Sequence, residues 1–424
     1  MEHGTTDPAE GAFETPVIAR GEALPSGTFT PFARGPFRLL VFSHGLAGLA
    51  FWGFFGTVFA QAAYRYHADA SGMAVLGASL SIPFIFGSLV QGLVVDRWSP
   101  KWITVIGYVA GAAAILLAWF GGSLLALYAS TVVVGAAVGT VEPSRSALTA
   151  LLVPEDRLVQ ANGTLAVAFQ ISLAVGPLAS GWLLHTRGAG AVYAVALAIA
   201  VVPPFLAVAI PDLRQRGETP SVSLADLRAG ASTIRRHDEL RLLLVVTALG
   251  WTLINVFFVL EPLFVRGTLH RGGDALLYLW GAHGVGAFLG SIALIRTRRA
   301  RGKEAMIVCT GVTAIGVGIA AYASAGIYGV SIVSASVTGV GFAMLFPPLF
   351  ALIQRVVPEE QRGRVTSVFV SCQEAMGLAS SFAIFVLGGL VVVRPTLVGS
   401  GGVIAFCGFI GLQGLRRSRD RAAA

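Results

Sequence analysis

The chain has 424 residues, of which 55% are hydrophobic and 12% are charged, and its formal net charge is +8. Soluble domains carry about 25% charged residues, so this composition excludes an ordinary soluble protein. The positive charge does not indicate nucleic-acid binding, because the Arg and Lys residues lie in the gaps between long apolar runs.

The first 37 residues are polar and rich in Gly, Pro, Thr and Glu. They lack the short apolar core and the small-residue cleavage site of a signal peptide. Because such a segment buries too little apolar surface to fold by itself, residues 1–37 are predicted to form a disordered cytoplasmic arm.

Apolar runs of membrane-spanning length fill the rest of the chain. A helix needs about 20 apolar residues to cross the hydrocarbon core. Lipid offers no partners for bare backbone groups, which favours helices. The sequence therefore predicts an all-α integral membrane protein with twelve transmembrane helices. The predicted spans are 39–63, 73–95, 102–120, 123–144, 163–184, 190–210, 241–264, 275–295, 304–324, 327–351, 365–392 and 396–413.

The longest polar gap inside the helical region separates six spans from six. We therefore expect an N-terminal six-helix bundle at 38–211 and a C-terminal six-helix bundle at 241–415. A cytoplasmic linker at 212–240 joins them, and a basic cytoplasmic tail follows at 416–424. Part of the linker, residues 223–237, can form a short amphipathic helix on the membrane surface.

The distribution of charge predicts the orientation. With the N-terminus inside, 25 of the 30 Arg and Lys residues fall on the cytoplasmic side. The outer gaps hold only Arg65, Arg187, Arg266, Arg271 and Arg394. This bias predicts a multi-pass protein of the inner (plasma) membrane with both termini cytoplasmic, and basic clusters that set topology or contact anionic lipid. The strong excess of Arg over Lys favours a bacterial origin.

The two halves contain an internal repeat. A shift of 204 residues places Pro143 on Pro347 and Pro154 on Pro358, and the second pair lies in the similar strings VPEDR and VPEEQR. Transporters are often built from two halves related by an axis along the membrane normal. We therefore expect a pseudo-two-fold relation between the bundles.

The gap between spans 2 and 3 reads GLVVDRWSPK over residues 92–101. Over residues 38–415 the chain resembles the major facilitator superfamily, whose motif in this gap is G-x-x-x-D-R-x-G-R-[KR]. Asp96 and Arg97 match that motif, whereas Ser99 and Pro100 depart from it. The resemblance implies a transporter fold in which Asp96 closes a cytoplasmic gate.

Span 5 contains a second motif. Gly176, Pro177 and Gly181 lie in a string that resembles the antiporter signature G-P-x-x-G-G, with Ser180 in place of one glycine. The stretch 154–162 looks like the drug and siderophore branch of the family, which includes enterobactin exporters. The glycine and proline either shape the cavity through a bend or serve ordinary helix packing.

The residues at the inner end of span 2 suggest an electrostatic latch. The Asp96 carboxylate can sit at a helix N-terminus of the other half, where the helix dipole attracts it. It can also pair with Arg145, near the inner end of span 4. The alternative is a simple charge pair at the membrane interface.

Three carboxyl groups lie inside apolar spans, at Glu142, Glu261 and Glu374. An ionised acid at the bilayer centre costs at least about 2.5–3.5 kcal/mol. Removal from water favours the neutral form, so such an acid can take up and release a proton. Glu374 is the strongest proton-coupling candidate, and its repeat partner is Gln170. The alternative role for Glu374 is a structural hydrogen bond.

The other two acids have local alternatives. Glu142 stands three residues before Arg145, which is the spacing of a helical ion pair near the inner gate. Glu261 lies towards the outer end of span 7, where it either takes part in coupling or forms an outer-gate pair with Arg266.

Further polar and aromatic side chains are candidates for lining a cavity for lipophilic or aromatic cationic substrates. Each has packing as its alternative, and the two histidines could also handle protons. These candidates are Trp52, Phe55, Gln170, Trp251, Asn255, His44 and His283.

The leading hypothesis is a secondary active, proton-coupled antiporter that exports a small amphipathic molecule such as a drug, siderophore or metabolite. The chain has no phosphate-binding loop, no catalytic serine elbow and no metal-ligand spacing, so we expect neither an enzyme nor a metal or other cofactor. The proton gradient would supply the energy. The expected partners are the substrate and membrane lipids, not nucleic acid, and a monomer is expected. The alternatives are a nutrient importer or facilitator, and a non-transporting membrane sensor or assembly protein.

Overall fold

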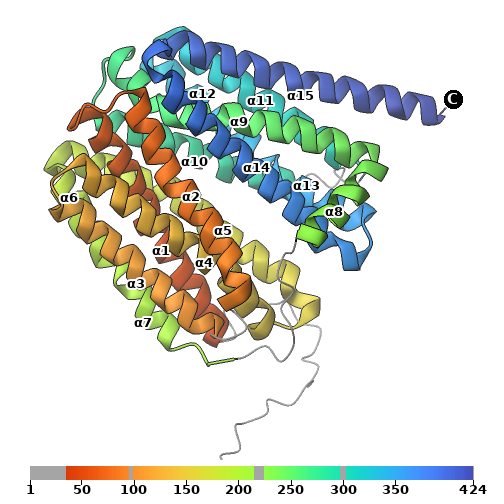
Figure 1. Ribbon diagram of the computed structural model, residues 1–424, viewed down its shortest axis with the longest axis horizontal. Coiled ribbons are helices and arrows are strands. Elements are labelled where there is room, and N and C mark those ends of the chain that lie inside the picture. Colours follow the sequence, from red (N-terminus) through yellow and green to blue (C-terminus); the bar gives the residue numbers. More distant parts are fainter. Residues whose placement is uncertain (1–34, 95–98, 214–223, 297–301, 424) are drawn as a thin grey trace, which may run out of the picture.

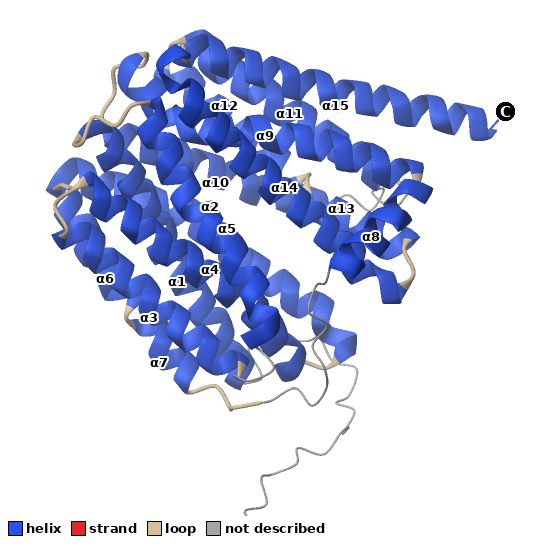
Figure 2. Ribbon diagram, in the orientation of Figure 1, coloured by secondary structure: helices blue, strands red, loops and turns tan. Residues whose placement is uncertain are grey.

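The computed structural model describes residues 35–94, 99–213, 224–296 and 302–423 (Figure 1). These residues form helices and connecting loops, and no strand occurs among them (Figure 2). Twelve helical segments are long and apolar enough to cross a membrane. The predicted all-α membrane fold is therefore confirmed.

Seven helices precede the linker. The sixth span is divided into two helices at Val201, because Pro203 and Pro204 follow at once and cannot donate backbone hydrogen bonds. The helices are α1 Gly35–Tyr64, α2 Ala70–Val94, α3 Pro100–Phe120, α4 Leu124–Leu152, α5 Leu158–Arg187, α6 Ala189–Ala200 and α7 Val202–Val208.

Eight helices follow. In the described part of the chain, α8 alone among them belongs to no candidate membrane span, and α12 and α13 together form one span. The helices are α8 Leu224–Arg236, α9 Asp238–Gly267, α10 Gly273–Arg296, α11 Glu304–Ala325, α12 Tyr328–Ala343, α13 Phe346–Val356, α14 Glu359–Leu387 and α15 Val393–Ala423. The last of these continues through the segment predicted to be a separate tail.

The repeat positions Pro143 and Pro347 have different structural effects. α4 continues through Pro143, whereas the corresponding tenth span breaks into α12 and α13 just before Pro347. A single proline removes one helical hydrogen bond, but Pro347 and Pro348 together remove two in succession and crowd the preceding turn. The two halves therefore differ locally at this point.

The helices before α8 and those after it form two groups that lie side by side (Figure 1). Between the groups, α2 packs against α14 and α5 packs against α10, while α1 contacts both α9 and α10. We call the end where α8 lies the linker end and the opposite end the loop end. The two groups approach each other at the loop end and diverge towards the linker end (Figure 1).

Polar contacts join the two groups at the loop end. Ser71 on α2 donates a hydrogen bond to the Phe385 carbonyl on α14 at 3.0 Å. Arg266 on α9 donates to the Ala63 carbonyl on α1. His185 Nδ1 on α5 lies 2.9 Å from Asp274 Oδ2 on α10. These contacts link three different helix pairs, so the loop end is closed in this conformation.

One glycine allows α5 and α10 to approach closely across the boundary between the halves. A Cβ atom at Gly284 on α10 would lie 2.6 Å from the backbone of Ala174 on α5. No side chain fits there without moving one helix. Small residues are the usual means of close helix contact in membranes.

The linker helix α8 packs on the C-terminal half. Its Asp226 pairs with Arg364 on α14 at 2.7 Å, and Thr233 donates a hydrogen bond to the side-chain carbonyl of Gln361 at 2.7 Å. Ile234 is buried beside this contact. The predicted short helix in the linker is present, and it is attached to the linker end of α14.

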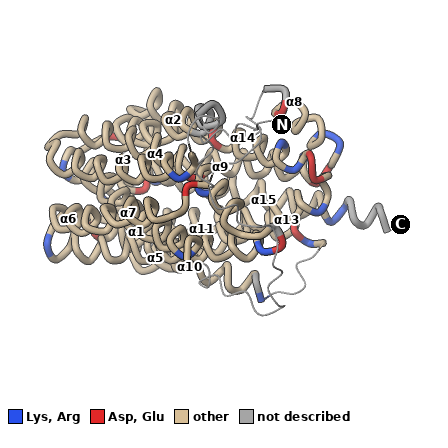
Figure 3. Tube along the Cα trace, turned by 90° about the horizontal axis from the view of Figure 1, so that it is seen from below, with Lys and Arg blue, Asp and Glu red and all other residues tan. Residues whose placement is uncertain are grey.

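Charged side chains gather at the ends of the helices. Several Lys and Arg residues in the described part of the chain lie near α8, α13 and the end of α15, and others lie near α3 and α6 at the opposite side of the view (Figure 3). Large apolar side chains such as Phe120, Phe205 and Leu390 are exposed, as expected of a surface that faces lipid. Most of the predicted N-terminal arm, residues 1–34, lies outside the described residues.

Candidate functional site

The N-terminal half contains a cavity of about 130 Å³ between α1, α3 and α4, with parts of α5, α6 and α7 in its wall. Its lining is mainly apolar and includes Ala47, Gly107 and other small residues. His44, Tyr108 and Glu142 supply its polar side chains. The arrangement combines an apolar wall with a few placed polar groups, which is the usual composition of a small-molecule site.

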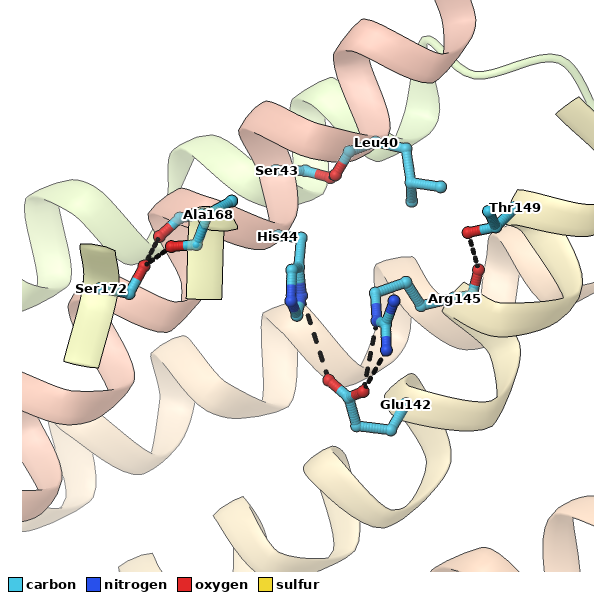
Figure 4. Close-up of polar contacts among 9 residues, drawn as sticks. Leu40, Ser43, His44, Glu142, Arg145, Thr149, Ala168 and Ser172 are labelled. Atoms are coloured by element: carbon cyan, nitrogen blue, oxygen red, sulfur yellow. Dashed lines mark hydrogen bonds and ion pairs between the residues drawn. The ribbon is translucent and has the colours of Figure 1, made fainter. Parts of the chain in front are cut away.

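Glu142 lies at the border of this cavity and is paired. Arg145 donates to Glu142 Oε2 from Nη2 at 2.6 Å and from Nε at 3.2 Å, while His44 Nδ1 lies 4.0 Å from Oε1 (Figure 4). The expected local ion pair is present because α4 remains helical through Pro143. The approach of His44 from α1 was not predicted. The Glu142 side chain is 38% exposed, so this pair is not sealed from its surroundings.

The predicted gate residues Asp96 and Arg97 lie outside the described residues. The proposed contact between Asp96 and Arg145 is therefore not located. Among the described residues, the Arg145 guanidinium pairs with Glu142.

The span 5 motif lies at two close helix contacts. A Cβ atom at Gly176 would be 3.1 Å from the Leu49 carbonyl oxygen on α1. A Cβ atom at Gly181 would be 3.1 Å from the Tyr278 ring on α10 of the other half. Helix α5 continues through Pro177. The packing interpretation of the motif therefore holds at both glycines, and its role in transport stays a prediction.

Glu374 lies on the face of α14 that meets α2 of the other half. On the same face, Ser381 comes seven residues later, and its Oγ would lie 3.5 Å from a Cβ atom at Gly77 on α2. Four residues further along, the Phe385 carbonyl accepts the hydrogen bond from Ser71. Glu374 lies two turns from Ser381 towards the linker end, where the halves diverge. Its half-buried carboxyl has no hydrogen-bond or ion-pair partner among the described residues.

Gln170 occupies the matching position at the other boundary between the halves. Its Nε2 lies 3.4 Å from Ser291 Oγ on α10. Its Oε1 is buried without a hydrogen-bond partner in the described part of the chain. The repeat predicted that Gln170 and Glu374 are equivalent, and each lies where its helix faces the opposite half.

Glu261 is not at an outer gate with Arg266, and that predicted alternative is wrong. The two residues are five positions apart and point about 140° from each other around a helix of 3.6 residues per turn. Glu261 is 2% exposed and accepts hydrogen bonds from Trp280 Nε1 at 2.9 Å and from the Tyr322 hydroxyl at 2.8 Å. It therefore lies inside the C-terminal half, and the three membrane acids occupy three separate places.

Aromatic rings form one connected series across both halves. Trp52 on α1 contacts Phe169 on α5 at a centroid distance of 6.0 Å, and Phe55 contacts Trp280 on α10 at 5.7 Å. The series continues into α9, α12 and α13. Its members, each in ring contact with the next or with a near neighbour, are His44, Phe169, Trp52, Phe51, Phe55, Phe59, Trp280, Phe258, His283, Phe342, Trp251, Phe346 and Phe350.

Of the other predicted cavity residues, His283 and Trp251 belong to this series, and Asn255 lies beside Trp251. His283 meets the edge of Phe342 at 4.9 Å, and Trp251 meets it at 6.1 Å. Asn255 donates to the Trp251 carbonyl at 3.2 Å and packs against Gly377 of α14. Five of the candidates predicted from the sequence thus belong to one set of ring contacts, which the sequence order did not reveal.

Sequence reasoning missed Trp280, Tyr322 and Phe342. Each is an aromatic residue in an apolar span, where packing is the ordinary role. A helical periodicity identifies one face of a helix but does not identify the neighbour that this face meets. The partners of Glu261 come from α10 and α11, and their position depends on how the helices assemble.

Comparisons with known proteins agree with this architecture. The Major Facilitator Superfamily profile matches residues 40–381. No curated protein sequence matches the chain significantly. Similar solved structures include the nucleoside transporter NupG in a mutant form, with a TM-score of 0.70 and 13% identity, covering 88% of this chain and 99% of that one.

Two further structures have the same fold. A POT family transporter in complex with 5-aminolevulinic acid has a TM-score of 0.73 and 12% identity, covering 89% of this chain and 95% of that one. A bacterial homologue of the human lysosomal transporter Spinster has a TM-score of 0.66 and 13% identity, covering 89% and 97%. The sequence profile covers most of the chain and the fold extends over nearly all of it. This chain therefore belongs to the Major Facilitator Superfamily, and it is a membrane transporter, not an enzyme.

Proposed function

We propose that this transporter is a proton-coupled antiporter that exports small amphipathic molecules by alternating access. The observation that carries the proposal is the unpartnered carboxyl of Glu374 on the α14 face that meets α2. An ionised carboxylate within hydrocarbon costs at least about 2.5–3.5 kcal/mol on insertion scales. Proton uptake removes that cost, so the charge of Glu374 can be linked to the distance between the halves.

The surroundings of Glu374 favour such a link. Contacts between α2 and α14 are closed at the loop end, near Ser71 and Phe385, and Glu374 lies about three turns from Phe385 towards the diverging end. A movement that closes the linker end would bring α2 against this carboxyl and remove it from water. The protonated form would then be favoured, because desolvation disfavours the charged form.

The proposed substrate class is supported by the ring series and by buried polar atoms that have no partner. Trp52 Nε1, Gln170 Oε1 and Gln373 Nε2 are buried without hydrogen-bond partners among the described residues. Buried polar atoms of this kind usually find a partner. An amphipathic molecule could place its apolar part on the rings and its hydrogen-bonding groups on these atoms.

The direction of transport rests on topology. The excess of Arg and Lys on one side favours a cytoplasmic linker end. The conformation described here, closed at the loop end, would then be the one that receives cargo from the cytoplasm. Inward proton flow through Glu374 would return the empty transporter to this state.

The test is transport in proteoliposomes with an imposed pH gradient of either sign, using a panel of amphipathic dyes and antibiotics. We expect Glu374→Gln to retain substrate binding but to lose at least about tenfold of gradient-driven transport, because the amide cannot exchange a proton. The matched control is Glu360→Gln, which replaces an exposed acid on the same helix and should transport like the parent.

Three other outcomes of this experiment would each contradict one part of the proposal. Gradient-driven transport by Glu374→Gln at the parent rate would remove this residue as the coupling site. Accumulation only in the direction of proton flow would identify an importer. Binding of cargo without its crossing of the bilayer would favour a sensor.

A further inference from the structure

Glu261 has no part in the proton pathway proposed above, yet it is the most deeply buried acid in the described spans. Its carboxyl lies between α9, α10 and α11 and is 2% exposed. Arg266, the basic residue of the same helix end, donates to a carbonyl of α1. No cation pairs with Glu261 among the described residues. Burying a carboxyl in a membrane span is costly, so its role is to accept hydrogen bonds from its neighbours.

Both of its oxygen atoms are used. Trp280 Nε1 donates to Oε2 at 2.9 Å, and the Tyr322 hydroxyl donates to Oε1 at 2.8 Å. Tyr322 is itself fixed by Phe257 and Phe264, whose ring centroids lie 5.1 and 5.5 Å away. A buried donor without an acceptor costs about 1–3 kcal/mol, so the carboxyl strongly restricts the orientation of the Trp280 ring.

Trp280 is the point at which this arrangement reaches the other half. Its ring lies 5.7 Å from both Phe55 and Phe59 of α1. A Cβ atom at Gly56, between those two residues, would lie 3.3 Å from the Trp280 ring, so α1 and α10 are in close contact here. The Trp280 ring is 5% exposed.

We propose that Glu261 is a positioning residue that holds Trp280 in the contact with α1 by which the loop end is closed. We call Glu261, Trp280 and Tyr322 the clamp. Loss of either hydrogen bond would let the Trp280 ring turn away from Phe55 and Phe59, and the loop end would open more often. This inference depends on the alternating-access part of the proposed function, and it does not depend on proton coupling.

A disulfide between Ala60 on α1 and Gly273 on α10 can report loop-end closure. The Ala60 Cβ lies 3.0 Å from the position of a Cβ atom at Gly273, which is about 0.5 Å below the usual range for a disulfide, so the two helices must separate slightly to form the bond. Both residues line an opening of about 470 Å³, which gives an oxidant access. The native cysteines Cys309, Cys372 and Cys407 all lie in the C-terminal half and are free, so by themselves they cannot join the halves.

The experiment follows disulfide formation in membranes containing the A60C/G273C protein. A protease site is inserted between residues 213 and 224. After cleavage, the two halves run as separate bands on a non-reducing gel unless the disulfide joins them. We expect Glu261→Leu and Trp280→Phe each to slow disulfide formation at least threefold, since the first removes both acceptor oxygens and the second removes the indole donor. Combined, they should be no slower than Glu261→Leu alone, because both remove the Glu261–Trp280 bond.

The controls separate a clamp from a structural role. Glu360→Gln should leave the disulfide rate unchanged, and A60C alone should give no joined product. A lower melting temperature with an unchanged disulfide rate in both Glu261→Leu and Trp280→Phe would overturn the proposal, as would effects that multiply in the double variant. Since the assay needs neither cargo nor a pH gradient, a slowed disulfide beside failed proton-driven transport would refute the coupling alone.

Discussion

At the scale of single residues, the ion pair at the N-terminal cavity shows what local spacing can predict. Glu142 and Arg145 are three positions apart, and the pair forms as that spacing predicts. The pair also lies 4.0 Å from His44, a residue about 100 positions away in the chain, and no local pattern could indicate that contact. The alternative in which Glu261 pairs with Arg266 is wrong for the converse reason, since Arg266 is near in sequence but faces a different side of α9.

We expect the Glu142–Arg145 pair to behave as a unit in a double-mutant cycle. Arg145→Ala leaves a carboxylate beside an apolar cavity and should lower stability, while Glu142→Gln in the same chain should recover part of the loss. Because Glu142 is 38% exposed, a coupling energy of about 1 kcal/mol is expected. Melting temperatures of the parent, both single variants and the double variant in one detergent measure it, and additive losses would show that the two side chains are independent.

At the scale of helices, hydropathy located the spans because each must cover the same thickness of hydrocarbon. Each predicted span overlaps one of the twelve membrane-length helical segments among the described residues, with bounds that differ by up to several residues. The interruptions were harder to predict. Pro143 leaves α4 intact, whereas Pro347 with Pro348 divides the tenth span, so one residue type has two outcomes that depend on its neighbour. Which helix faces pack together is also absent from the sequence pattern.

The close crossing of α10 and α12 provides a test at this scale. A Cβ atom at Gly339 on α12 would lie 2.8 Å from the Ala287 backbone nitrogen on α10, whereas nothing lies within 4 Å of a Cβ atom at Gly329 on the same helix. We expect Gly339→Ala to cost about 1–3 kcal/mol by overpacking. Gly329→Ala should be neutral or slightly stabilising because alanine favours the helix. Equal melting temperatures for the two variants in detergent would show that the crossing can relax.

At the scale of the whole molecule, the repeat predicted that Gln170 and Glu374 are equivalent, and both lie at boundaries between the halves. The conformation could not be predicted in the same way. Alternating-access states use the same helices and differ by only a few kcal/mol in contacts between the halves. Ser71, Arg266 and His185 show which end is closed here, and none of them forms a motif.

If transport requires the loop end to open, a covalent bond across it must stop transport. We expect complete oxidation of the A60C/G273C protein to reduce transport in proteoliposomes to the level of empty liposomes, and a reductant to restore it. The disulfide joins α1 to α10, whose contact also involves Phe55 and Trp280, so the two halves can no longer separate there.

The matched control is G45C/A168C, in which a Cβ separation of 3.6 Å joins α1 to α5 within the N-terminal half, away from the lining of the cavity. Because these helices belong to one group, their disulfide should leave transport unchanged, which would separate the effect of bridging the halves from that of oxidation. Continued transport by fully oxidised A60C/G273C protein would mean that cargo does not cross between α1 and α10 of the two halves. The movement would then have to occur at the α2–α14 boundary alone, where Glu374 lies, and the clamp on Trp280 would hold a contact that stays closed throughout the cycle.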